Sequence, residues 1–244
     1  MDNDLWLLIE RGLSRLPDMR VPVTQGDYQP PAAGLAYARL VGYFEIGLHE
    51  EENSEGETLL RDRVDLVFEL SGPNHPARKF DDDTLIPHRV TVQERLSLEV
   101  WANFFNLFTA MNAAHGGTAR HMVQLLHRPF IVEVFHRRGK NRKVYANLKG
   151  PNGYNVRGTS YKDEETGEFK TVEVPPAITE LKAFIWELAN KAMWDSIHIP
   201  GFYEERKNDK GEVVSPARSK NVLQERIMSA KNWPELAARL GLNS

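Results

Sequence analysis

Apolar and polar residues alternate along five segments in the first part of the chain, as they do in β-strands that bury one face. A helical pattern over residues 97–114, which begins at the potential N-cap Ser97, separates the third segment from the fourth. In this helix Leu98, Trp101 and Phe105 share a stripe that we expect to be buried. The predicted strands are residues 35–47, 59–70, 88–96, 130–137 and 143–149.

The order of these elements, three strands, a helix and two strands, is that of an OB-fold. An OB-fold is a five-stranded Greek-key barrel, and its helix here lies between the third and fourth strands. We therefore predict a mainly β protein with added helices (α+β), in which residues 34–158 form an OB-fold-like core. Alternate apolar side chains, such as Val64, Leu66 and Phe68, are expected to fill the barrel.

Helical spacing predicts extensions at both ends of this core. An amphipathic helix over residues 3–16 and a Pro- and Gly-rich linker make up the N-terminal segment, residues 1–33. Residues 159–244 combine hairpins with a second amphipathic helix over residues 177–194 and two short terminal helices. The apolar stripes of these extensions either pack on the core or serve self-association, and we expect a homo-oligomer.

Composition restricts the partners and the compartment. The 244 residues include 31 Lys and Arg and 34 Asp and Glu, a net charge of −3, so a polyanion must bind to a local patch. The absence of cysteine excludes disulfides and thiolate chemistry. The apolar run near the N-terminus is too short to span a membrane and lacks the cationic start of a secretory signal. We expect a cytoplasmic protein without membrane contacts.

A local basic patch occurs in the hairpin from Arg128 to Arg157. Between Arg128 and Lys149 there are seven Lys or Arg and one acid, Glu133. Strand alternation places Phe135 and Tyr145 among the cations of one face. Cations bind phosphates and aromatic rings stack on unpaired bases, so this pattern is typical of proteins that bind single-stranded nucleic acid.

The outward faces of the strands predicted over residues 35–47 and 59–70 also combine aromatic rings with cations, and we expect one continuous surface that binds nucleic acid. A slip of one residue in strand register would exchange this face with the core. The predicted nucleic-acid-binding residues are Tyr37, Arg39, Tyr43, Arg63, Phe135, Arg137, Arg138, Lys140, Arg142, Lys143, Tyr145, Lys149 and Tyr154.

Motifs of catalysis are missing from the sequence. It has no HExxH zinc motif, no Walker phosphate loop, no GxSxG elbow and no GxGxxG fingerprint. We therefore expect no enzyme activity, no metal, no cofactor and no small-molecule substrate. Three consecutive acids, Asp81, Asp82 and Asp83, leave a metal-dependent nuclease with nearby histidines as a weak alternative.

Several phrases together resemble phage-encoded single-stranded DNA-binding proteins of small tailed phages. They are PPAAG, VDLVFELSGPNH, LSLEVWANFFNLFTAMN, GKNRKVYANLKGPNGYNV and FIWELANKAMWDSI, and the resemblance covers roughly residues 30 to 200. It implies an OB-type core, self-association, and binding of single-stranded DNA without strong sequence preference. It also implies a role in phage DNA replication, recombination or early gene expression. The chain ends in ELAARLGLNS, so recruitment of partners through an acidic C-terminal tip is not expected.

The sequence therefore predicts single-stranded DNA as the main partner, with duplex DNA and RNA as weaker ones. The alternative is a structural or assembly protein of the phage particle. In that case the amphipathic helices matter and the basic hairpin is incidental.

Overall fold

A computed structural model describes residues 29–79, 83–139, 142–162 and 165–242. The chain divides into two units, Met1–Pro30 and Pro31–Ser244, and every element below belongs to the second. The helix predicted over residues 3–16 and most of the predicted linker lie outside the described residues, as does Lys140.

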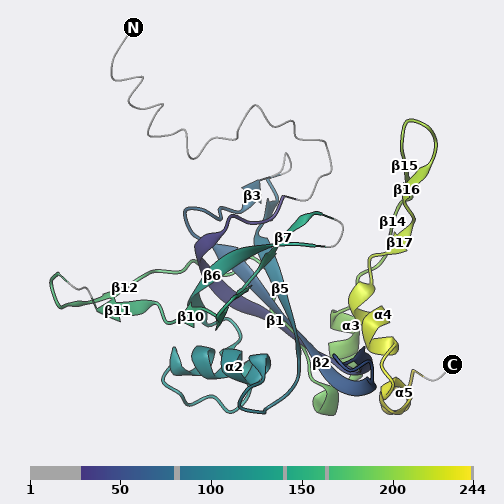
Figure 1. Cartoon of the computed structure of the whole chain (residues 1–244), viewed down its shortest axis with the longest axis horizontal. Helices are drawn as coiled ribbons and strands as arrows, with labels where there is room; N and C mark the ends of the chain where they lie inside the picture. Colours follow the sequence, from purple (N-terminus) through teal and green to yellow (C-terminus); the bar gives the residue numbers. More distant parts are fainter. Residues whose placement is uncertain (1–28, 80–82, 140–141, 163–164, 243–244) are drawn as a thin grey trace, which may run out of the picture. The chain divides into compact units, whose positions relative to one another are not determined.

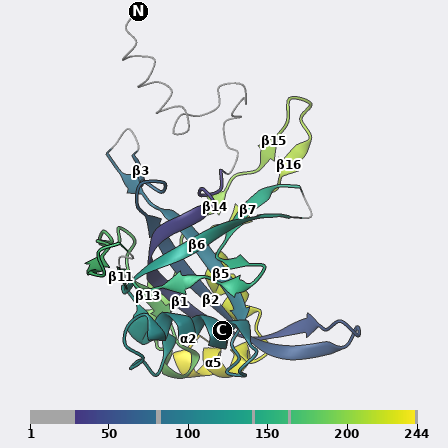
Figure 2. The same ribbon diagram turned by 60° about the vertical axis from the view of Figure 1, so that its left-hand side comes forward.

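A seven-stranded sheet forms the centre of the fold (Figure 1). Its strands are β1 (Gly34–Glu52), β2 (Thr58–Ser71), β5 (His88–Arg95), β6 (Pro129–Arg138), β7 (Val144–Asn147), β10 (Val156–Arg157) and β13 (Lys182–Phe184). The hydrogen-bonded order is β10-β6-β1-β2-β5, with β13 added parallel to β1 and β7 antiparallel to β6. In Figure 2 the hairpin of β1 and β2 extends beyond the sheet at the lower right.

The remaining strands form small hairpins, and the helices are short. The hairpin strands are β3 (Arg78–Lys79), β4 (Leu85–Ile86), β8 (Lys149–Gly150), β9 (Gly153–Tyr154), β11 (Ser160–Lys162), β12 (Phe169–Thr171), β14 (Phe202–Tyr203), β15 (Arg206–Lys207), β16 (Val213–Ser215) and β17 (Arg218–Ser219). The helices are α2 (Asn103–Ala113), η2 (Met122–Leu125), η3 (Trp186–Leu188), α3 (Lys191–Ser196), α4 (Val222–Met228) and α5 (Trp233–Leu240).

These elements confirm the α+β class, with antiparallel pairing throughout the sheet apart from β13. The helix α2 lies between β5 and β6 in the chain, as predicted. Within the described residues β5 and β7 share no hydrogen-bonded ladder, so the sheet is open and not a closed barrel.

The first hydrophobic cluster lies between the sheet and α2. The alternation of β2 was predicted correctly, because Val64, Leu66 and Phe68 are fully buried in this cluster. Leu107 and Met111 of α2 pack there as well. Burial of these apolar surfaces is the main stabilising contribution to this half of the unit.

The start of α2 differs from the prediction, because the helix begins at Asn103. Ser97 does not cap it: the Ser97 hydroxyl accepts a hydrogen bond from the Glu99 amide at 3.3 Å, a local turn that competes with helix formation. Leu98 and Trp101, expected to be buried, are therefore 72% and 73% exposed.

The strand β1 changes the face that it presents to the core. Its register with β2 shifts between Leu40 and Gly42, as at a β-bulge. Before the shift Leu40 faces the first cluster, and after it Tyr43 does. Phe44 and Ile46 then face the opposite side and belong to a second cluster.

The second cluster joins β1 to the C-terminal residues. Phe184, Trp194, Ile227 and Leu236 pack there with residues of β1. The continuous helix predicted over residues 177–194 is wrong, because this stretch forms β13, η3 and α3 instead.

Two buried carboxylates account for that departure from helical periodicity. Glu69 accepts hydrogen bonds from the Ile178 and Thr179 amides at 2.8 and 2.7 Å, and Glu45 accepts one from the Trp186 amide at 2.7 Å. These long-range bonds satisfy backbone groups that a helix would satisfy locally, so tertiary contacts override the local pattern.

Candidate nucleic-acid interface

The basic hairpin predicted from the sequence is formed by β6 and β7. Phe135 lies opposite Asn147, Arg137 opposite Tyr145, and Arg138 opposite Val144. The connecting loop is closed by a hydrogen bond from the Gly139 amide to the Lys143 carbonyl at 2.8 Å. Arg142 in this loop has a φ of 63°, the left-handed conformation that tight turns require.

The two faces of this hairpin have the predicted division. Phe130, Val132 and Val134 are buried in the first cluster, together with Leu148. Because directly opposite residues of an antiparallel pair point to the same side, Tyr145 and Arg137 share the outer face. Tyr145 is 41% exposed, so part of its side chain reaches solvent.

The arginines of this hairpin are free to neutralise an anion. Arg137, Arg138 and Arg142 are exposed, and their side chains form no ion pair or hydrogen bond with any residue that the structure describes. Lys143 is exposed as well, and Lys140 lies outside the described residues. The three arginines thus place positive charge without an acid partner, among the described residues, next to an exposed aromatic ring.

Tyr43 is not part of this interface, and its prediction as a binding residue is wrong. It is completely buried, because the bulge in β1 turns its ring into the first cluster. Its hydroxyl donates a hydrogen bond to Glu45 at 2.9 Å. Burial, together with the neighbouring carboxylate, raises the pKa of Tyr43 well above its ordinary value.

Tyr37 and Arg39 serve structural contacts instead of facing open solvent. The Arg39 guanidinium donates to the carbonyls of Pro175, His127 and Val174, each at 2.6 Å, and so ties distant segments to β1. The Tyr37 ring is half-buried over Gly72, where an added Cβ would lie 2.9 Å from it. The continuous surface expected across β1 is therefore interrupted.

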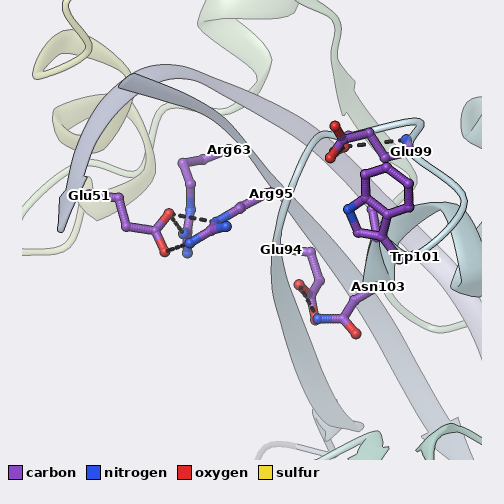
Figure 3. Close-up of a pocket in the computed structure, with 9 residues that line it drawn as sticks. Glu51, Arg63, Glu94, Arg95, Glu99, Trp101 and Asn103 are labelled. Carbon is purple, nitrogen blue, oxygen red and sulfur yellow. Dashed lines mark hydrogen bonds and ion pairs between the residues drawn. The ribbon is translucent and has the colours of Figure 1, made fainter. Parts of the chain in front are cut away.

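Arg63 lies near the middle of β2, opposite Arg95 of β5, in a cleft of about 410 Å³ (Figure 3). There Glu51 binds Arg63 at 3.1 Å and Arg95 at 2.5 Å. The hydrogen bond from Arg95 is the main reason why the pKa of Glu51 is lowered. Arg63 is thus compensated by an acid, in contrast to the arginines of the basic hairpin.

Three further predicted residues, Phe135, Lys149 and Tyr154, are held by contacts within the fold. The Tyr154 hydroxyl donates to Glu94 at 2.7 Å, and Lys149 approaches the same carboxylate at 3.5 Å. Burial, and then this hydrogen bond, raise the pKa of Tyr154 above its ordinary value. Phe135 is half-buried against Gly150, where an added Cβ would lie 2.5 Å from its ring.

The predicted set is therefore divided. Five of its members, Arg137, Arg138, Arg142, Lys143 and Tyr145, are exposed on or next to the loop of β6 and β7. Lys149 is exposed as well but lies 3.5 Å from Glu94, and Lys140 lies outside the described residues. The other members are buried or half-buried.

Sequence reasoning missed several exposed aromatic rings elsewhere. Trp101 was assigned to the core, because its spacing from Leu98 matches the buried stripe and no residue type marks the late start of α2. Phe169, Phe202 and Tyr203 lie on small hairpins and are also exposed. Their place in polar hairpins, bounded by turn residues, was the available signal.

The described residues also bear on a metal site and on a membrane-spanning helix. Among the described residues, no group of three His, Asp or Glu side chains is placed to hold a metal ion. Asp81 and Asp82 of the nuclease alternative lie outside those residues. No helix in the described ranges is both long and apolar enough to cross a membrane.

Comparisons with family models, curated proteins and solved structures found no match to this chain.

Proposed function

We propose that this protein binds single-stranded DNA through the hairpin of β6 and β7. The observation that carries the proposal is the exposed pair of Tyr145 and Arg137, surrounded by arginines without an acid partner among the described residues. A base stacks on Tyr145, while Arg137, Arg138 and Arg142 neutralise phosphates. Phosphate contacts of this kind carry no sequence information, so binding is sequence-tolerant.

The strand pairing supports this assignment. If β1, β2, β5, β6 and β7 are taken as the five strands of an OB-fold, they pair in the order β7-β6-β1-β2-β5. The ladder between β5 and β7, which would close the barrel, is missing among the described residues. OB-folds bind oligonucleotides with the loops between strands one and two and between strands four and five. The loop between β6 and β7 occupies the second of these positions, and Arg142 in this loop has no acid partner among the described residues.

The biological setting that we propose follows from the family resemblance of the sequence. The protein coats single-stranded phage DNA as a homo-oligomer in the host cytoplasm, during replication, recombination or early gene expression. No catalytic step is part of this function.

The test is a titration of fluorescently labelled oligo-dT by anisotropy at two salt concentrations. The affinity should fall with salt, with a log-log slope of about −0.7 for each phosphate contacted. Tyr145→Ala should weaken binding by about 1–3 kcal/mol, and Arg142→Ala should weaken it less and flatten the slope. No binding at low salt would refute the proposal.

A matched control separates the hairpin from general electrostatics. Arg61 is an exposed arginine of β2, and Arg61→Ala removes the same charge outside the basic hairpin. Its affinity and slope should equal those of the parent protein. If Arg61→Ala and Arg142→Ala weaken binding equally, the interface is not the one described.

A further inference from the structure

A second hairpin places an aromatic ring beside cations. β14 pairs with β17, and β15 pairs with β16 in the ribbon that continues from them (Figure 1). The Lys220 amide donates to the Gly201 carbonyl at 3.0 Å and closes the base of this hairpin. We call residues 201–220 the arm. In Figure 1 the arm extends beyond α3 and α4 as a two-stranded ribbon.

Two cations gather around one ring at the base of the arm. Arg218 lies directly opposite Tyr203, with its guanidinium carbon 5.0 Å from the ring centroid. The Lys220 ammonium lies 5.4 Å from the same centroid. Neither cation forms an ion pair with an acid that the structure describes. The arrangement leaves Tyr203 51% exposed and the neighbouring Phe202 71% exposed.

The exposure of the Tyr203 ring does not stabilise the fold. A two-stranded ribbon of this kind buries little apolar surface, and exposed aromatic rings lose the stabilisation that burial would give. The same arrangement, a ring opposite a cation across two strands, occurs at Tyr145 and Arg137 on the basic hairpin. It occurs again at Tyr161, which lies opposite Lys170 in β11 and β12.

We propose that the arm is a second contact for single-stranded DNA. The proposal rests on the function proposed above and extends its site beyond the basic hairpin. A base stacks on Tyr203 or Phe202, while Arg218 and Lys220 bind the adjoining phosphates. A protein partner would have to offer acids to both cations, whereas the phosphate backbone offers an anion at every nucleotide. The observations therefore favour nucleic acid over a second copy of the chain.

The experiment compares the full-length parent with three variants on two oligo-dT lengths. The short oligonucleotide has about 8 nucleotides, within the footprint of one OB-type fold, and the long one has about 40. The variants are Tyr203→Ala, a deletion of residues 202–219 and the control Val214→Ala. The deletion joins Gly201 to Lys220 through an Asn-Gly turn, because their backbones are already hydrogen-bonded. Val214 is 60% exposed on the same arm and carries no stacking ring.

We expect the deletion to weaken binding of the long oligonucleotide by roughly tenfold or more, the effect of losing one stacked base. The salt dependence should become less steep by about 0.7, for the phosphate contact that is lost with Arg218, because Lys220 remains in this variant. Tyr203→Ala should show part of the same loss, and Val214→Ala none. Binding of the short oligonucleotide should stay unchanged in all three, and circular dichroism should show a folded protein.

Three results would overturn the arm as a DNA contact. If the parent protein binds neither oligonucleotide, the proposed function fails and this extension fails with it. If the parent binds and the deletion binds the long oligonucleotide as tightly, the arm alone is refuted. If the deletion changes the oligomeric state in light scattering while affinity stays unchanged, the arm contacts a second copy instead.

Discussion

The ion pair between Asp65 and Arg226 should be the strongest single link between the sheet and the C-terminal helices. Asp65 lies on β2 and is 4% exposed, and Arg226 reaches it from α4 with both terminal guanidinium nitrogens. Gln93 donates a further hydrogen bond at 3.2 Å. Arg226→Ala leaves a buried carboxylate with this one amide partner.

The cost follows from the burial of the acid. Removing one partner of a buried ion pair costs about 3–5 kcal/mol, because the remaining charge stays desolvated. The Arg226 side chain is 33% exposed, so water reaches the site once it is shortened and reduces the penalty. We therefore expect Arg226→Ala to lower the free energy of unfolding by about 2–3 kcal/mol.

Urea denaturation followed by tryptophan fluorescence measures this change. The double variant Asp65→Asn, Arg226→Ala should recover part of the loss, because it removes the uncompensated charge. Lys231→Ala is the control: it removes an exposed ion pair with Glu50 and should cost less than about 1 kcal/mol. A loss for Arg226→Ala no larger than that of the control would refute the reasoning.

Two further predictions concern stability and its dependence on pH. Tyr43→Phe removes the hydroxyl that donates to Glu45, so the free energy of unfolding should fall by about 1–2 kcal/mol while the affinity for oligo-dT stays unchanged. A loss of affinity without a loss of stability would mean that Tyr43 contacts the DNA. Burial lowers the pKa of His88 and of His115 below 6.5, so the unfolded chain binds protons first as the pH falls. Stability, measured by thermal unfolding, should therefore decrease from about pH 7 towards pH 5, and less steeply in His88→Gln. A rise in stability over this range would contradict the lowered pKa values of these histidines.

The sequence was informative where the two faces of a strand differ in polarity. In β2 the alternation of Val64, Leu66 and Phe68 with polar residues identified the core face correctly. In β1 the residues from Leu40 to Ile46 are all buried, because the C-terminal residues cover the second face. Periodicity cannot separate two buried faces, so the position of Tyr43 was assigned to the wrong one.

One residue did carry a signal for the bulge in β1. A Cβ at Gly42 would lie 2.6 Å from the Phe44 ring and 3.1 Å from Val67, so this strand position requires glycine. Glycine inside a strand pattern often marks a bulge or a close approach. In contrast, the conversion of residues 177–194 from a predicted helix to β13, η3 and α3 depends on Glu45 and Glu69, which lie more than a hundred positions away.

The shift in β1 also has a consequence for how this unit unfolds. Because one continuous strand contributes Tyr43 to the first hydrophobic cluster and Phe44 and Ile46 to the second, neither cluster can lose that strand alone. Detaching the C-terminal helices would expose Phe44 and Ile46 and loosen the strand that the first cluster shares. The two clusters are therefore coupled into one cooperative folding unit, whose denaturation is expected as a single transition.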